Sequence, residues 1–209
     1  MCHRAKQTRM SFPISNNKAS RIFSLIHCDI WGAYHTPSLS GARYFITIVD
    51  DFSRSTWIYL MKQKSEACQV IMNFYKMVKT QFNLNIQIIR SDNGTEFTSG
   101  PLKSFLLQNG ILFQSSCVGT PQQNGRVERK HRHILNVARA LRFQAHLPIS
   151  FWGECALTAG YLINYTPSTI LNGKTLFEVL FGKHPNYSQI KIFGCLCYVK
   201  VPNSDKFGE

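Results

Sequence analysis

Three of the chain's few acidic residues stand where a carboxylate is unusual. Asp and Glu number 11 among 209 residues, against 24 Lys and Arg. Asp29 interrupts an apolar segment, Asp92 follows another, and Glu128 lies in a basic segment with helical spacing. A carboxylate in an apolar strand loses its hydration, which raises its pKa unless a cation neutralises it. Two aspartates on neighbouring strands and a glutamate on a nearby helix could share Mg²⁺ or Mn²⁺, which prefer hard oxygen ligands.

Such a set of acids predicts phosphoryl-transfer chemistry. Two divalent ions about 3.5–4 Å apart can activate a nucleophile and stabilise the leaving oxygen. A structural role is the alternative, in which Asp29 pairs with a nearby arginine or caps a turn. The three acids by themselves leave both interpretations open.

The remaining acids of interest flank these positions. Asp50 and Asp51 lie between two strand-like segments, where we expect a turn with one of them accepting hydrogen bonds from backbone amides. Glu96, four residues after Asp92, could orient a metal-bound water or a neighbouring lysine, or lie on the surface.

The elements that must position these acids follow from hydrophobic periodicity. Short segments rich in β-branched and aromatic residues predict strands at 25–31, 44–49, 56–61, 86–89, 112–115 and 190–201. The first three are joined by short connections, which predicts an antiparallel meander. Cys195 and Cys197 alternate in the last segment, where we expect buried thiols.

Helical spacing fills the stretches between these strands. Apolar residues three and four apart predict helices at 65–81, 102–108, 125–145, 151–164 and 175–181. The order of strands and helices predicts an α/β fold, a mixed sheet flanked by helices with a helical C-terminal extension.

Charge and composition narrow the class of partner. The net charge of +13 favours a polyanion, most simply nucleic acid, although charge alone does not exclude an acidic membrane surface. No run of eighteen apolar residues is present, so we expect no transmembrane helix, and the basic N-terminus lacks the apolar core of a secretory signal. The seven cysteines form no CxxC pair, which makes a disulfide framework improbable.

The predicted helix at 125–145 carries a dense group of cations around Glu128. We interpret four of them as candidates for DNA phosphate contacts, namely Arg126, Arg129, Lys130 and Arg132. Arg132 follows Glu128 by four residues and therefore lies on the same helix face. A solvated basic face is the alternative interpretation.

Several motifs, taken in order, resemble the integrase core of copia-type long-terminal-repeat retrotransposons. They are HCDIWG, RYFITIVDDFSR, RSDNGTEF and TPQQNGRVERKHRHI, continued by LPISFWGECALTAGYLIN, FGKHP and KIFGCLCYV. Thirty-five residues separate Asp92 from Glu128, which is similar to the spacing in retroviral and retrotransposon integrases. The resemblance covers essentially the whole chain and implies a ribonuclease H-like fold and a fragment of a transposon Pol polyprotein.

The resemblance also implies an activity. Asp29, Asp92 and Glu128 would hold two Mg²⁺ or Mn²⁺ ions for 3′-end processing of element DNA and strand transfer into target DNA. The loop 120–125 resembles the family's active-site loop, in which Gln122 and Asn124 are candidates to contact the strand. Double-stranded DNA and further copies of the chain are the expected partners, with no membrane, and the expected place of action is the nucleus, with a cytoplasmic particle as an alternative and no secretion.

The expected domain organisation has three parts. Residues 1–21 form a basic arm, a remnant of the family's upstream zinc module in which Cys2 is the last of four ligands, so we expect no zinc here. Residues 22–148 form the catalytic core, and 149–209 form the helical extension with the start of the following region. Two alternative functions remain: a catalytically silent DNA-binding remnant and a simple nuclease of the ribonuclease H type.

Overall fold

A five-stranded mixed sheet forms the centre of the molecule, in the order β3-β2-β1-β4-β5. The computed structural model describes residues 18–115 and 125–198. The strands are β1 (Leu25–Gly32), β2 (Tyr44–Asp50), β3 (Thr56–Met61), β4 (Ile88–Ser91) and β5 (Leu112–Ser115). β1 pairs with β2 and β2 with β3 in antiparallel fashion, which confirms the predicted meander, whereas β4 runs parallel to both β1 and β5.

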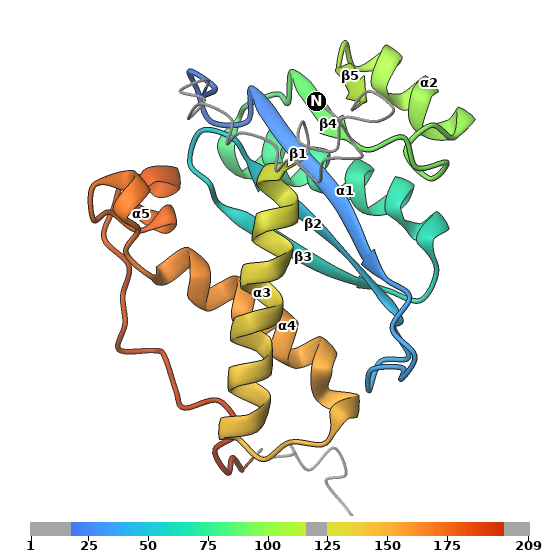
Figure 1. Cartoon of the computed structure of the whole chain (residues 1–209). Helices are drawn as coiled ribbons and strands as arrows, with labels where there is room; N and C mark the ends of the chain where they lie inside the picture. Colours follow the sequence, from blue (N-terminus) through green and yellow to red (C-terminus); the bar gives the residue numbers. More distant parts are fainter. Residues whose placement is uncertain (1–17, 116–124, 199–209) are drawn as a thin grey trace, which may run out of the picture.

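Helices cover both faces of this sheet (Figure 1). They are α1 (Ala67–Phe82), α2 (Gly100–Gln108), α3 (Gly125–Gln144), α4 (Trp152–Tyr165) and α5 (Leu176–Phe181), with short 3-10 turns η2 (Lys64–Glu66), η4 (Ile149–Phe151) and η5 (Thr169–Leu171). Strands and helices of this kind confirm the predicted α/β fold with a helical C-terminal part. No helix in the described ranges is long and apolar enough to cross a membrane.

Two hydrophobic cores lie on opposite faces of the sheet. On one face, α1 buries Ile71, Phe74 and Val78, which recur at helical spacing, against strand residues such as Cys28 and Ile46. On the other face, α3 and α4 pack together over Phe45 of β2. Alternate residues of a strand point to opposite faces, so the neighbours Phe45 and Ile46 belong to different cores.

The backbone of α4 approaches β3 very closely at two glycines. A Cβ atom built on Gly160 would lie 2.6 Å from Ile58 Cδ1, and one built on Gly153 would lie 2.8 Å from Leu60 Cδ1. Real side chains do not approach this closely, so the helix can lie this near the sheet only because both positions lack a side chain.

Two predictions about strands need correction. β4 begins and ends two residues later than the predicted strand at 86–89, so Asp92 follows it directly. The strand predicted at 190–201 is wrong for its described part, since residues 190–198 contain no strand. A strand needs a partner for its backbone groups, and this segment pairs with no described strand, so Cys195 and Cys197 are exposed rather than buried.

Candidate active site

Asp29 lies on β1, and Asp92 lies directly after β4, the parallel strand beside it. In the register of β1 and β4, His27 stands beside Arg90. Asp29 follows His27 by two residues on β1, and Asp92 follows Arg90 by two residues, directly after the last residue of β4. The parallel pairing therefore brings two residues distant in sequence to the same level of the sheet.

Glu128 approaches this pair from the first turn of α3. The helix packs against β1 and β2 on the sheet face to which Asp29 points, opposite to the buried Cys28. The side chain of Asp29 is 17% exposed, whereas Asp92 and Glu128 are exposed. The sequence prediction placed Asp29 in a strand, Asp92 after a strand and Glu128 in a helix, and the structure has Asp29 in β1, Asp92 directly after β4 and Glu128 in α3.

The pKa of Asp29 shows that the three acids influence one another. Burial raises the pKa of this carboxyl to about 7, the charge of Asp92 adds to the effect, and Glu128 contributes further. A hydrogen bond from the Ile30 amide to Asp29 Oδ1, 2.9 Å long, acts in the opposite direction. A divalent cation would relieve this crowding of negative charge, so the donor set fits a hard metal ion.

Asp29, Asp92 and Glu128 lie near one another, but their oxygens are not arranged as the ligands of one metal ion. Across residues 18–115 and 125–198, no group of three or more His, Cys, Asp or Glu side chains is close enough to hold a metal ion. The chemistry of the donors thus suits Mg²⁺ or Mn²⁺, and the ion would have to draw their oxygens together on binding.

His131 is a member of the site that the sequence prediction did not single out. Its Nδ1 lies 3.5 Å from Asp29 Oδ2, and its ring meets Phe45 edge-on at 5.5 Å. Burial lowers the pKa of His131 to about 4, so we treat the ring as neutral and the contact as polar rather than ionic. Its position three residues after Glu128, on the same helix face, was the available signal.

Glu96 has a charged neighbour at the edge of the site. Lys64 Nζ lies 3.7 Å from Glu96 Oε1, in agreement with the predicted option of a lysine partner. Glu96 also raises the pKa of Asp29 slightly, after the effects of burial, Asp92 and Glu128. Its charge therefore reaches the site although its own contact is with lysine.

Asp50 accepts hydrogen bonds inside the turn after β2. Its Oδ2 accepts from the Ser53 amide and hydroxyl, both at 2.7 Å, and its Oδ1 accepts from the Phe23 amide at 2.8 Å. The side chain is fully buried. These contacts confirm the structural role predicted for this turn.

Asp51 connects four segments of the chain. Its carboxylate accepts hydrogen bonds from the Ala19 amide at 2.7 Å and from His27 Nε2 at 2.8 Å, and it pairs with Arg54 and Arg126. Burial alone would raise the pKa of Asp51, but the hydrogen bonds and the two guanidinium groups hold it well below its usual range. Asp51 therefore remains ionised and fixes the start of α3, two residues before Glu128.

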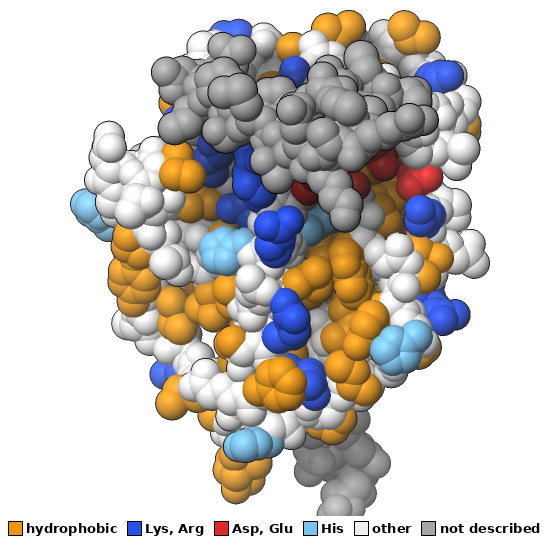
Figure 2. Space-filling model, viewed as in Figure 1, with side chains coloured by type: hydrophobic (Ala, Val, Ile, Leu, Met, Phe, Trp, Pro, Cys, Tyr) orange, Lys and Arg blue, Asp and Glu red, His pale blue; other side chains and the backbone are white. Residues whose placement is uncertain are grey.

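The predicted DNA contacts fall into three structural settings. Arg126 is engaged with Asp51, and Lys130 is half-buried, with a pKa that burial and the nearby Arg54 lower to about 8. Arg129 and Arg132 are exposed on α3. In Figure 2, basic side chains follow one another down the front face over α3. The DNA contacts themselves stay predictions, and Gln122, Asn124 and Cys2 lie outside the described residues.

Comparisons with known proteins indicate the family. The family model described as "Integrase core domain" matches residues 19–121. The chain is 37% identical over 205 residues to the "Retrovirus-related Pol polyprotein from transposon TNT 1-94" of Nicotiana tabacum, and 37% identical over 197 residues to that from transposon RE2 of Arabidopsis thaliana. These matches include 98% and 94% of this chain, but only 15% and 13% of the length of the two relatives.

A solved structure supports the fold. The chain is similar in fold to the "HTLV-2 integrase catalytic core domain in complex with magnesium (trimeric form)", with a TM-score of 0.56 and 19% sequence identity. The match covers 74% of this chain and 94% of the other. At this identity the likeness concerns the fold, a mixed sheet flanked by helices of the ribonuclease H-like type.

Proposed function

This chain carries an integrase core domain and belongs to the retroviral integrase superfamily, and we propose that it performs divalent-metal-dependent 3′-end processing and strand transfer on DNA. The observation that carries the proposal is the placement of Asp29 level with Asp92, with the charge of Glu128 felt at Asp29. The three residues supply only oxygen donors, which suit two Mg²⁺ or Mn²⁺ ions. No zinc is part of the proposal.

Both reactions are substitutions at the phosphorus of a phosphodiester. Either water or a DNA 3′-hydroxyl attacks the phosphorus, and its oxygen gives a proton to solvent. The bond from phosphorus to the opposite oxygen breaks, and that oxygen leaves with the electron pair and takes up a proton from solvent. Bound divalent ions supply activation of the attacking oxygen and stabilisation of the leaving oxygen. Asp29, Asp92 and Glu128 would hold the ions, and His131, whose Nδ1 lies 3.5 Å from Asp29 Oδ2, would help to orient that carboxylate.

Exposed cations on α3 are suited to hold the DNA. Arg132 stands on the face of Glu128, one helical turn further along, and Arg129 is exposed beside it. Guanidinium groups grip phosphate without reading sequence, which gives binding that weakens as salt rises. The substrates would be element ends and target DNA, the enzyme would act as a homo-oligomer, and the site of action would be the nucleus.

The test is a nicking and strand-transfer assay on a labelled element-end duplex with Mg²⁺ or Mn²⁺. We expect metal-dependent nicking by the wild-type chain and its loss in Glu128→Gln. Glu154→Gln is the matched control, since Glu154 stands in the first turn of α4 as Glu128 does in α3, and it should leave nicking unchanged.

A second function is favoured by one observation, the absence of a formed three-ligand cluster among the described residues. A folded wild-type chain that binds DNA with the usual salt dependence but never nicks it would be a catalytically silent DNA-binding remnant. Preferential cleavage of an RNA–DNA hybrid would instead indicate a nuclease of the ribonuclease H type.

A further inference from the structure

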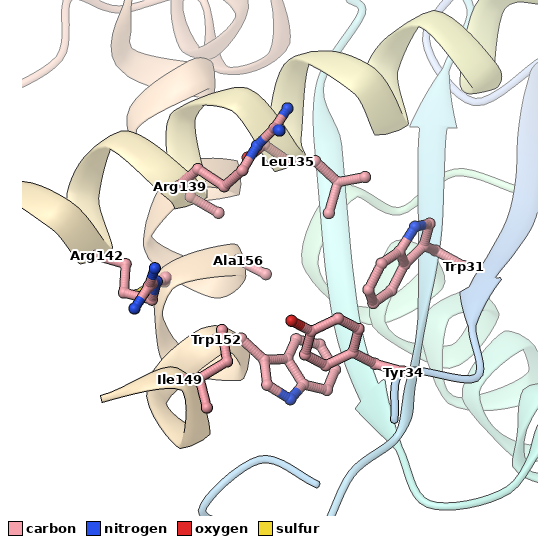
Figure 3. A pocket seen from close by; sticks show the side chains of 10 residues that line it. Trp31, Tyr34, Leu135, Arg139, Arg142, Ile149, Trp152 and Ala156 are labelled. Carbon is pink, nitrogen blue, oxygen red and sulfur yellow. The ribbon is translucent and has the colours of Figure 1, made fainter. Parts of the chain in front are cut away.

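An aromatic pocket lies between the end of β1 and the helices α3 and α4 (Figure 3). Its volume is about 270 Å³. The rings of Trp31, Tyr34 and Trp152 form one wall, and Arg139 and Arg142 of α3 stand at its edge. The other lining residues that the structure describes are apolar, and none of the described lining residues is acidic.

The pocket continues the same face of α3 that carries Glu128. One row of side chains along α3 is formed by Glu128, Arg132, Leu135, Arg139 and Arg142. Successive members of the row are four, three, four and three residues apart. Side chains at this spacing lie on one face. Since the helix rises about 1.5 Å per residue, Arg139 stands roughly 16 Å along the axis from Glu128.

The neighbouring strand leads from the acids to the pocket as well. Trp31 follows Asp29 by two residues on β1, so both side chains point to the same face of the sheet. Trp31 therefore lies roughly 7 Å beyond Asp29 along the strand. A DNA strand bound at the acids and following this direction would pass directly over the pocket.

The aromatic wall is held rigidly before any ligand arrives. Trp31 stacks on Phe45 with ring centroids 5.1 Å apart, and Tyr34 lies 5.5 Å from Trp31. Trp152 Nε1 donates a 2.9 Å hydrogen bond to the Thr36 carbonyl. In Figure 3 the Tyr34 hydroxyl points into the pocket. A flat ligand would thus lose little free energy in ordering its binding site.

We propose that this pocket binds an unpaired base of a DNA strand, while Arg139 and Arg142 pair with the adjoining phosphate. A nucleotide combines a flat aromatic ring with an anion, and the pocket combines aromatic rings with two guanidinium groups. Its volume lies below the roughly 300–1,000 Å³ of pockets for drug-sized ligands, which suits a single base. This proposal rests on the proposed function, which brings a DNA strand to the three acids beside the pocket.

The geometry also sets the position of the bound base. Successive phosphates of a strand in a duplex are about 3.4 Å apart along the axis. The roughly 7 Å from Asp29 to Trp31 and the roughly 16 Å from Glu128 to Arg139 therefore correspond to about two and about five nucleotides. The base in the pocket would lie about two to five nucleotides from the phosphodiester at the three acids.

The test compares two single-stranded probes of equal length and charge. One is an oligodeoxyadenylate, and the other has the same backbone with abasic sites. Binding is measured by fluorescence anisotropy with EDTA present, so that no metal-dependent cleavage interferes. We expect the base-bearing probe to bind about tenfold more tightly to the wild-type chain, as expected for one stacked base.

Variants assign this preference to the pocket. Tyr34→Ala should abolish the preference for bases, whereas Tyr34→Phe keeps the ring and should retain most of it. Arg139→Ala should weaken both probes by a similar factor of about three to tenfold, because it removes a phosphate contact. Lys79→Ala, which removes an exposed cation from α1 on the other face of the sheet, should change neither probe.

Three results would overturn the proposal. Equal affinity for the two probes, or a preference that survives Tyr34→Ala in a chain with an unchanged melting temperature, would exclude base binding here. Saturable binding of an acidic, tryptophan-containing peptide in place of the oligonucleotides would assign the pocket to a protein partner. If the wild-type chain prefers the base-bearing probe but does not nick DNA with Mg²⁺ or Mn²⁺, the result would contradict the proposed catalytic function and leave the base-binding proposal intact.

Discussion

Arg126 and Asp51 form an ion pair across 75 residues of the chain. The pair fastens the first turn of α3 to the turn after β2, and Asp51 is 1% exposed while Arg126 is 23% exposed. Glu128 stands two residues beyond Arg126, so the contact between Arg126 and Asp51 helps to determine the position of the Glu128 carboxylate. The position of α3 thus depends on a charge outside the predicted metal site.

Asp51→Asn should lower the free energy of unfolding by about 3 kcal/mol, because it removes the buried charge that balances two partly exposed guanidinium groups and accepts hydrogen bonds from Ala19 and His27. The measurement is urea denaturation near neutral pH. Arg54→Gln is the control: Arg54 also contacts Asp51, at 3.3 Å, but is 22% exposed, and should cost less than about 1 kcal/mol. Equal costs for the two variants would show that Asp51 does not hold the network together.

The same carboxylate predicts a pH dependence of stability. The pKa of Asp51 is depressed in the folded state, so the unfolded chain binds more protons at acidic pH. Its contribution is therefore complete above the unfolded pKa of about 3.9 and is lost as the pH falls toward the lower folded pKa. The difference in unfolding free energy between wild type and Asp51→Asn should shrink below about pH 4. If the difference in unfolding free energy between wild type and Asp51→Asn stays constant from neutral pH to below about pH 4, the pKa of Asp51 is not depressed in the folded state.

His131→Phe separates positioning from stability. The ring volume is retained, but the nitrogen 3.5 Å from Asp29 is lost. We expect Mn²⁺ affinity, measured by electron paramagnetic resonance, to fall about tenfold, because a residue that orients a metal ligand typically contributes this much. The melting temperature should hold or rise, since His131 Nε2 is buried without a hydrogen-bond partner among the described residues.

His133→Phe provides the matched comparison for that experiment. His133 is exposed on the same helix, two residues further along, and should leave Mn²⁺ affinity unchanged. If both variants bind Mn²⁺ as tightly as the wild type, His131 has no part in positioning Asp29.

The sequence predicted the positions of the three acids well because each depends on local pattern. Short apolar segments rich in β-branched and aromatic residues define the strands around Asp29 and Asp92, and helical spacing defines the helix that carries Glu128. The contact of Asp51 with Arg126 depends on packing between distant segments, which no local pattern encodes. Helical spacing could place His131 beside Glu128, but its contact with Asp29 also depends on how α3 packs against β1. The strand predicted at 190–201 failed for the opposite reason, since its pattern had no described strand to pair with.

The close approach of α4 to β3 predicts a cost for added volume. Gly160→Ala places a Cβ within 2.6 Å of Ile58 Cδ1 and should destabilise the protein by about 1–2 kcal/mol, despite the better helix propensity of alanine. Gly100→Ala is the control, because a Cβ there meets nothing within 4 Å, and it should not destabilise. Ile58→Val removes Cδ1 and should recover part of the loss in the double variant, as measured by a denaturation cycle. Strictly additive costs would mean that the helix moves away from β3 and that Ile58 does not limit its approach.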